Sequence, residues 1–252
     1  MQLNKYLASC GVASRRKANL MISQGRVAVN RETVRELGRV IDIQSDEVFF
    51  DGRRLGIPDH YLYILMNKPK GVITAVHDNR GRETVIDLIA SERRVFPVGR
   101  LDYDTEGVLL LTDDGYLAYR LTHPKFRIEK VYEAWVEGQV EEKSIQKLKE
   151  GISFSDKVIV KGIGRIIKKD RGKTLIEISI HEGKKRQIKR MMKAIGHPVL
   201  QLARICFAGL TVHDLKSASW RELSEQEVQS LYQQVGLQKS GYEAYQINNF
   251  LG

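Results

Sequence analysis

Three carboxylates stand at alternate positions in the segment GRLDYDTEG, residues 99–107. They belong to Asp102, Asp104 and Glu106, and the apolar run VLLLT follows directly. A carboxylate can act as a nucleophile, a general base or a metal ligand. If the segment is extended, the three side chains point the same way. In a polar turn closed by Gly107 they would instead be solvated, and the spacing alone leaves both interpretations open.

The charge of the whole chain bears on what those carboxylates face. The 252 residues carry a net charge of +10 at pH 7, and the pI is about 9.5. The basic residues are clustered, because residues 1–31 hold six of them with no acid and residues 161–193 hold twelve with three acids. A clustered basic surface attracts polyanions, most often nucleic acid. The charge distribution therefore favours a nucleic-acid partner over a merely basic surface.

The remaining composition excludes several classes of protein. Apolar residues make up 42% and charged residues 29% of the chain, which is typical of a soluble globular protein. No apolar run approaches the roughly 20 residues that a membrane span needs, and the N-terminus shows no secretory signal. Cys10 and Cys206 provide no disulfide framework, which favours a reducing cytoplasm. The six histidines have no metal-ligand spacing, so we expect neither a metal nor a cofactor.

Two further segments can contribute to binding or chemistry. KVYEAWV is a half-buried strand in which Tyr132 can stack on a base, for about 1–3 kcal/mol, or can pack in the core. HEGKKRQIKRMMKAIGHPV gathers cations around a helix start, and helical spacing places Lys185, Lys189 and Lys193 on one face. A solvated helix face is the alternative, but so many like charges repel one another unless an anion is bound.

These segments must be positioned by a fold that mixes helices and strands. Helices are expected at 3–11, 15–24, 84–92, 115–123, 141–151, 185–196 and 224–236. Strands are expected at 26–30, 38–42, 46–52, 61–76 (two strands around a turn), 108–112, 130–138, 158–167, 174–180 and 200–210. Runs of strands without regular strand–helix alternation predict an α+β fold with a mixed or largely antiparallel sheet.

The N-terminal segment KYLASCGVASRRKANLMISQGRVAVN resembles the small RNA-binding domain of ribosomal small-subunit protein S-four. It carries that family's leucine helix, Ser-Arg-Arg helix start and Gly-x-Val-x-Val-Asn pattern. Arg15, Arg16 and Lys17 crowd the first helical turn, where the helix dipole disfavours cations. This placement indicates that they face phosphates. The resemblance implies binding of structured RNA and does not by itself imply catalysis.

Three further motifs resemble the RsuA/RluB family of ribosomal RNA pseudouridine synthases, most closely its RluB branch. GRLDYDTEGVLLLTDDG, EKVYEAWVEG and HEGKKRQIKRMMKAIGHPVLQL occur in that family's order and spacing. The resemblance implies an S-four-like domain over 1–60, a catalytic domain over 61–236 and a polar tail over 237–252. It implies a mixed, largely antiparallel central sheet flanked by helices. The implied activity is isomerisation of a specific uridine to pseudouridine in ribosomal RNA, 23S in the RluB branch, without a cofactor.

The resemblance also assigns roles to residues of the motifs. Asp102 falls on the catalytic aspartate, Tyr132 on the base-stacking tyrosine, and Lys189 on the cation that pairs with the aspartate. Many relatives have arginine at that last position, and lysine lacks its bidentate fork. We therefore expect a single hydrogen-bonded pair between Lys189 and Asp102. The residues expected to bind RNA are Lys5, Arg15, Arg16, Lys17, Arg26, Arg100, Lys184, Lys185, Arg186 and Arg190.

Two other functions remain compatible with parts of the chain. A non-catalytic RNA-binding or ribosome-associated factor would need only the N-terminal segment. A metal-dependent nuclease would use the three acids of residues 102–106 as ligands. Under the synthase interpretation, the partner is ribosomal RNA or an assembling ribosomal particle, and we expect a monomer with no membrane contact. Asp102 would attack the sugar or base as a nucleophile, or would remove a ribose proton to give a glycal-like intermediate.

Overall fold

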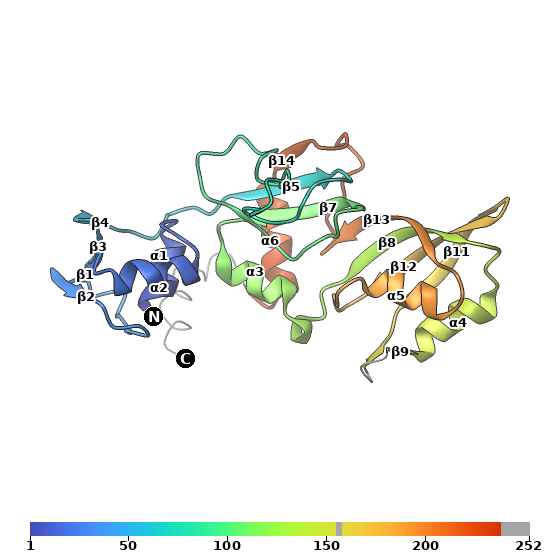
Figure 1. Ribbon diagram of the computed structural model, residues 1–252, viewed down its shortest axis with the longest axis horizontal. Coiled ribbons are helices and arrows are strands. Elements are labelled where there is room, and N and C mark those ends of the chain that lie inside the picture. The colour runs from blue at the N-terminus through green and yellow to red at the C-terminus, as the bar shows by residue number, and fades with distance from the viewer. Residues whose placement is uncertain (155–157, 238–252) are drawn as a thin grey trace.

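The computed structural model describes residues 1–154 and 158–237, and in it a small N-terminal unit precedes a larger one (Figure 1). The small unit contains helices α1 (Leu3–Ser9) and α2 (Arg15–Ser23). Its sheet has the order β2-β1-β3-β4. These strands are β1 (Val27–Val29), β2 (Glu32–Val34), β3 (Val48–Phe50) and β4 (Arg53–Arg54). Both helices and the sheet share a separate apolar core.

One strand expected in this unit, at 38–42, is absent. Val40 makes only an isolated bridge to Gln2 and is 64% exposed, while Ile41 is buried. A strand needs a face that packs on neighbours, and here a single side chain reaches the core. The prediction of a strand at 38–42 is therefore wrong.

The larger unit is built on an eight-stranded sheet of order β11-β12-β8-β13-β7-β5-β14, with β6 paired to β7. Its strands are β5 (Tyr63–Lys68), β6 (Phe96–Pro97), β7 (Thr105–Thr112), β8 (Lys130–Glu137), β11 (Ile163–Asp170), β12 (Lys173–Ile180), β13 (Val199–Phe207) and β14 (Trp220–Glu222). Strand β13 runs parallel to β7, and the other neighbours are antiparallel. A separate pair joins β9 (Ile152–Ser153) and β10 (Ile159–Val160). The prediction of a mixed, largely antiparallel α+β fold is confirmed.

Strand β7 is buried on both faces, which explains its unbroken apolar run. Val108 and Leu110 pack in one cluster with α3 (Gly115–Thr122) and α6 (Glu225–Gln234). Leu109 and Leu111 point the opposite way, into the cluster that includes side chains of α4 (Glu142–Glu150) and α5 (Gln187–Ala194). A strand buried on both faces reads as a continuous apolar run. Figure 1 shows α3 and α6 beside β5 and β7, with α4 and α5 near the β11–β12 end.

The helix expected at 84–92 is instead a series of turns. The Asp87 carboxylate accepts hydrogen bonds from the Thr84 backbone N–H (2.8 Å) and hydroxyl (2.9 Å). Such side-chain bonds offer the backbone an alternative to the helix. Val85 and Ile89 are both buried at helical spacing. The apolar pattern therefore identified buried residues correctly, although the segment is not a helix. The second strand expected within 61–76 is likewise reduced to a bridge between Ile73 and Thr84.

No helix of the described ranges has the length and hydropathy of a membrane span. The tail expected at 237–252 lies, apart from Leu237, outside the described residues.

Candidate active site

A pocket of about 350 Å³ opens where β7, β8 and β13 meet the loop before α5. Its position follows from the strand register. Leu202 of β13 lies opposite Thr105 of β7 on one side and Ala134 of β8 on the other. The register thereby brings the 99–105 segment to Tyr132 although thirty residues separate them in sequence. The lining residues are Gly99, Arg100, Leu101, Asp102, Thr105, Tyr132, Ile180, Gly183, Lys184, Lys185, Arg186, Gln187, Ile188 and Leu202.

The three acids of the 102–106 segment do not point the same way. The backbone N–H of Thr105 donates to the Asp102 carbonyl at 3.0 Å, which closes a turn before β7 begins. Asp102 lines the pocket, Asp104 pairs with a lysine of α5, and Glu106 pairs with Lys70 at 3.2 Å. Among the described residues, the carboxylate of Asp102 makes no such pair. The turn therefore separates one pocket-facing carboxylate from two that form ion pairs.

The separation of the acids also bears on metal binding. Within residues 1–154 and 158–237, no three His, Cys, Asp or Glu side chains are grouped so that they could hold a metal ion. A metal-dependent nuclease needs carboxylates that converge on one point. The acids of the 102–106 turn have different partners and do not form such a ligand set.

The expected pair between Lys189 and Asp102 is replaced by another pair. Lys189 Nζ lies 2.5 Å from Asp104 Oδ1, and its side chain is 20% exposed. The hydrogen bond from Lys189 lowers the pKa of Asp104 below its ordinary value, so the pair is charged at neutral pH. The physical reason for the difference is the turn, which directs Asp104 toward α5 and Asp102 into the pocket. The predicted Lys189–Asp102 pair is thus wrong for this structure.

The buried side chain of Lys68, which was not among the residues selected from the sequence, supports this turn. Lys68 has no exposed surface, and its ammonium donates to the carbonyls of Pro69 (2.9 Å), Thr105 (3.0 Å) and Asp102 (3.4 Å). Burial lowers its pKa to about 8, against the opposing effect of the three nearby carboxylates. A lysine at the end of the apolar strand YILMNK, before proline, was the available signal. Its hydrogen bonds tie the end of β5 to both ends of the turn.

The strand after the turn requires glycine. Gly107 has φ +104°, and a Cβ there would lie 2.2 Å from the carbonyl oxygen of Arg204 on β13. Arg204 is itself 2% exposed, with Nε donating to the Val108 carbonyl at 2.8 Å and the guanidinium 4.8 Å from the Phe207 ring. These contacts set the close approach of β13 to β7, and with it one wall of the pocket.

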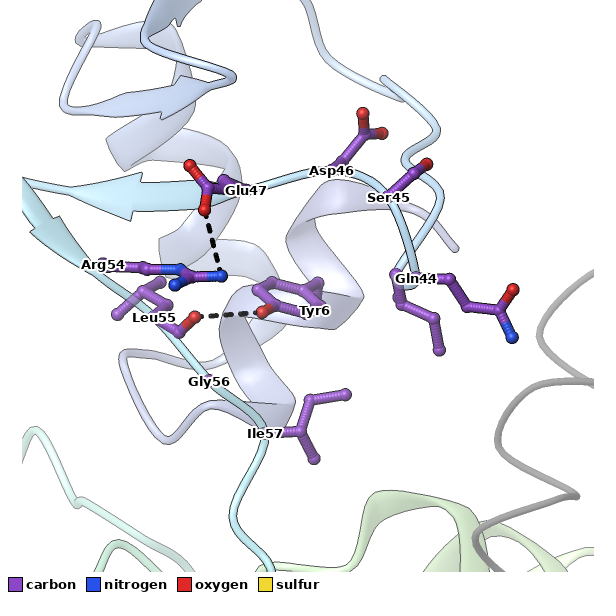
Figure 2. Close-up of a pocket in the computed structure, with 10 residues that line it drawn as sticks. Tyr6, Gln44, Ser45, Asp46, Glu47, Arg54, Leu55, Gly56 and Ile57 are labelled. Atoms are coloured by element: carbon purple, nitrogen blue, oxygen red, sulfur yellow. Dashed lines mark hydrogen bonds and ion pairs between the residues drawn. The ribbon is translucent and has the colours of Figure 1, made fainter.

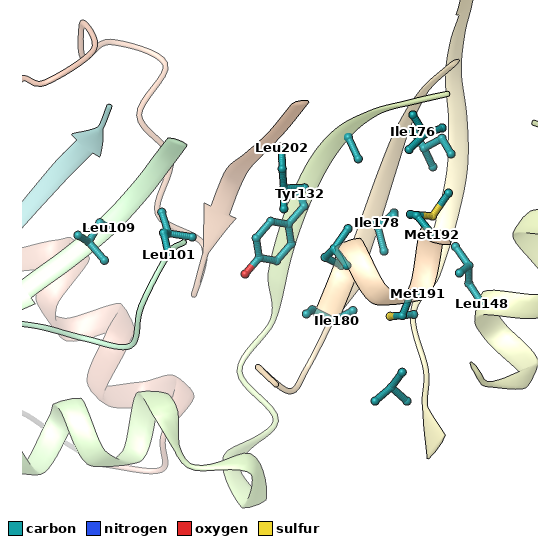
Figure 3. Close-up of a cluster of buried hydrophobic side chains, with 14 of the residues drawn as sticks. Leu101, Leu109, Tyr132, Leu148, Ile176, Ile178, Ile180, Met191, Met192 and Leu202 are labelled. Carbon is teal, nitrogen blue, oxygen red and sulfur yellow. The ribbon is translucent and has the colours of Figure 1, made fainter. Parts of the chain in front are cut away.

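Tyr132 lies at the boundary between the pocket and the core. It is 8% exposed and belongs to the large apolar cluster. Figure 3 shows its ring beside Leu202, with the hydroxyl directed away from Ile178 and Ile180. Tyr132 therefore packs in the core and also lines the pocket, and its stacking on a base stays a prediction.

The basic segment before α5 forms a loop over the pocket rather than the start of the helix. Arg186 occupies the N-cap position in the left-handed region (φ 53°), so Lys185 precedes the helix and does not share a face with Lys189. The buried amide of Gln187 accepts a hydrogen bond from the Lys184 backbone N–H at 2.9 Å, which holds the loop. The prediction that Lys185 shares a helix face with Lys189 is therefore wrong. The cations of the 184–186 loop line the pocket instead.

Other predicted RNA-binding residues lie away from this pocket. Arg190 stacks on Phe154, with the guanidinium carbon 3.7 Å from the ring centre. Arg16 and Lys17 are exposed at the start of α2. Arg26 forms an ion pair with an aspartate of its own unit.

Two further pockets involve the N-terminal unit. One, of about 760 Å³, is shown in Figure 2 and is bordered by Asp46 and Glu47, which makes it unsuited to phosphate. The other, of about 630 Å³, brings Lys5 and Arg15 together with residues of the larger unit. Lys5 is partly buried there, and desolvation together with Arg15 lowers its pKa.

Comparison with known proteins identifies the family. Residues 62–194 match the RNA pseudouridylate synthase family, and residues 1–48 match the S4 domain. The chain belongs to the RNA pseudouridylate synthase family. This synthase is 43% identical to an RNA pseudouridine synthase of Aquifex aeolicus over 94% of the chain and 96% of the relative. It is 40% identical to the ribosomal large subunit pseudouridine synthase B of Bacillus subtilis over 91% of the chain and 95% of the relative.

A solved structure agrees with the fold as well. The crystal structure of a pseudouridylate synthase superposes with a TM-score of 0.65 at 29% identity, and it covers 92% of this chain and 99% of its own. The synthase is thus an RNA-modifying isomerase of the RsuA/RluB type, with an N-terminal S4 domain that binds RNA.

Proposed function

We propose that this synthase isomerises a uridine of large-subunit (23S) ribosomal RNA, with Asp102 as the catalytic carboxylate and no cofactor. The observation that carries the assignment is the position of Asp102, the one acid of its turn that lines the pocket beside Tyr132. The choice of RNA is supported by the Bacillus subtilis relative, whose name places its activity on the large subunit. The domain division at 1–60 and 61–236 is supported by family matches over 1–48 and 62–194.

We expect basic side chains to bind the phosphate backbone of the RNA first, and the target base to enter the pocket afterwards. The exposed cations of α2 and of the 184–186 loop attract the phosphate backbone, so affinity falls steeply with salt. The target uridine must leave its stack to reach Asp102. Its base then stacks on the pocket side of Tyr132. We expect the synthase to do this as a monomer in the cytoplasm, on ribosomal RNA or on an assembling ribosomal particle.

The reaction rearranges bonds within one nucleotide. The glycosidic bond from nitrogen 1 breaks, the uracil turns, a bond from carbon 5 to the ribose forms, the carbon 5 proton leaves, and nitrogen 1 takes up a proton. Asp102 either attacks the sugar or base as a nucleophile, or removes a ribose proton to give a glycal-like intermediate. Lys189 acts through Asp104 as a positioning residue that holds the turn against α5.

Tyr132 can also serve as the base that removes the carbon 5 proton. A variant that lacks the tyrosine hydroxyl tests this role. In Tyr132→Phe the ring still stacks, so we expect RNA affinity within about twofold of wild type. Turnover at saturating RNA should fall about a hundredfold, as for loss of a general base. Single-turnover tritium release and a binding isotherm measure the two quantities. A Tyr132→Phe rate equal to the wild-type rate would remove the hydroxyl from the mechanism.

Lys68 is expected to act by positioning the turn. In Lys68→Met the volume is nearly kept, but two hydrogen bonds to the turn and one to the Pro69 carbonyl are lost. We expect turnover at saturating RNA to fall about ten- to a hundredfold, because a displacement on the order of 1 Å misplaces Asp102. Affinity for RNA should stay within about twofold.

Lys70→Met is the matched control, because this lysine lies two residues further on and is 41% exposed in its pair with Glu106. It should keep the single-turnover rate within about threefold of wild type. An equal loss in the two variants would assign the effect to surface charge and would contradict a positioning role for the buried ammonium.

The substrate assignment is tested by tritium release from three RNAs labelled at carbon 5 of uracil. Large-subunit, small-subunit and transfer RNA transcripts are incubated with wild-type protein in excess chelator, and the releasing RNA is mapped for pseudouridine. We expect release from large-subunit RNA at a single position, with RNA length unchanged. Release from small-subunit RNA alone would overturn the choice of RNA. Tight binding without release from any of the three would favour the RNA-binding factor.

A further inference from the structure

The segment formed by α3 and the following 3-10 turn η1 (Pro124–Phe126) has a composition suited to nucleic acid. Its sequence, GYLAYRLTHPKFR over residues 115–127, contains no acid and combines two arginines and a lysine with two tyrosines, a histidine and a phenylalanine. Two acids precede it, but Asp114 is buried as the cap of α3 and Asp113 pairs with Arg93. The exposed part of the segment therefore carries positive charge and rings without a compensating carboxylate of its own.

Three rings form a cluster at the surface of this segment. The Tyr119 ring centre lies 5.1 Å from that of His123 and 6.5 Å from that of Phe126. Tyr119 is 50% exposed, so part of its side chain is accessible to a further partner. Lys125 Nζ lies 4.9 Å from the Phe126 ring centre, and the neighbouring Arg127 is exposed. We call Tyr119, His123, Lys125, Phe126 and Arg127 the α3–η1 platform.

The platform is held rigidly by interactions on its inner side. Arg120 places its guanidinium 5.0 Å from the Phe126 ring centre and donates to the Val235 carbonyl of the α6 end at 2.7 Å. The His123 ring accepts a hydrogen bond from the Lys125 backbone N–H at 3.2 Å. A rigid aromatic surface loses little conformational entropy when a base stacks on it.

The platform lies between the two regions already assigned to RNA. At one end, Tyr119 lines the pocket that also contains Arg15 of the S4 domain. At the other end, Thr122 lies 3.6 Å from the Cβ position of Gly99, which lines the Asp102 pocket, and the Arg127 carbonyl lies 2.8 Å from His181 Nδ1. Figure 1 shows α3 between the N-terminal unit and the strands that form the active site.

We propose that the α3–η1 platform binds unpaired nucleotides of the substrate RNA between the S4 domain and the target uridine. Bases stack on Tyr119, and phosphates pair with Lys125 and Arg127, the arrangement of rings and cations that serves single-stranded nucleic acid elsewhere. The platform rests on the proposed function, because its ligand is the RNA that the active site modifies.

Substitutions at Tyr119 test the stacking. The probe is the ribosomal transcript from which wild type releases tritium, and both its dissociation constant and its single-turnover rate at saturation are measured. Tyr119→Leu should raise the dissociation constant about tenfold while the saturated rate stays within about twofold. Tyr119→Phe keeps the ring and should bind within about twofold of wild type. Wild-type affinity in Tyr119→Leu, with folding confirmed by its melting temperature, would overturn the platform.

The charge of the platform is tested by salt dependence. Lys125→Gln should lower the slope of log affinity against log salt by about 1, as for loss of one phosphate contact. Lys149→Gln, on the exposed face of α4 at the far end of the sheet, should leave the slope unchanged. Equal slopes in Lys125→Gln and Lys149→Gln would contradict a phosphate contact. Failure of the proposed function can be distinguished from failure of the platform, because wild-type protein would then release no tritium.

Discussion

Asp102→Asn is expected to lower the single-turnover rate of uridine isomerisation by at least about a thousandfold, because asparagine neither attacks as a nucleophile nor accepts a proton at neutral pH. The substitution is nearly isosteric and lies at a half-buried pocket position. RNA affinity should therefore stay within about twofold of wild type. Tritium release under single-turnover conditions and a binding isotherm check the two expectations.

The matched control lies in the same turn. Glu106→Gln makes the same chemical change at a side chain that pairs with Lys70 rather than lining the pocket. Its rate should remain within about threefold of wild type. Equal losses at Asp102 and Glu106 would indicate that the acids act together, as in a metal site, and would contradict the role assigned to Asp102 alone.

Gly107→Ala is expected to destabilise the fold by about 3 kcal/mol or more and to reduce turnover with it. The added Cβ would lie 2.2 Å from the Arg204 carbonyl oxygen, so β7 or β13 must move. The displaced strand begins at Thr105, directly after the turn that carries Asp102. Urea unfolding gives the stability, and tritium release gives the activity. A variant that does not fold at all would agree with the same clash.

Gly172→Ala separates the clash from the strain of a positive φ. Gly172 has φ +70° and open space around its Cβ position. Only the left-handed conformation is penalised there, which costs about 1–2 kcal/mol. If Gly107→Ala unfolded at the same urea concentration as Gly172→Ala, the close approach of β13 to β7 would not be what requires glycine at position 107.

Much of the fold was predictable because local patterns carry it. The α3 and α6 segments have polar caps at Asp114 and Ser224, and the apolar run at 108–112 predicted the strand that is observed as part of β7. A helix was wrongly predicted at 84–92 because Val85 and Ile89 have helical spacing. The hydrogen bond from the backbone of Thr84 to the Asp87 side chain instead holds the segment in turns. Competition between side-chain and backbone hydrogen bonds is not visible in an apolar pattern.

The sequence selected two residues that meet in one pocket, while their catalytic roles stay predictions and the pairing of Lys189 was not predicted. The family motifs led to Asp102 and Tyr132, and strand register brings these two to one pocket. The partner of Lys189 depends on how a turn of four residues directs its carboxylates, which no spacing rule contains. Lys68 was missed because a lysine in an apolar strand has meaning only when its acceptors are known. The partners of both lysines are set by tertiary contacts, which the sequence pattern does not contain.

The most direct measurement compares wild type and Asp102→Asn on the same large-subunit ribosomal RNA in excess chelator. The RNA is digested to nucleosides, and pseudouridine is quantified by chromatography alongside tritium released from carbon 5. We expect pseudouridine and tritium in equal amounts with wild type, neither with Asp102→Asn, and full-length RNA in both. Pseudouridine formed by Asp102→Asn at the wild-type rate would contradict this expectation.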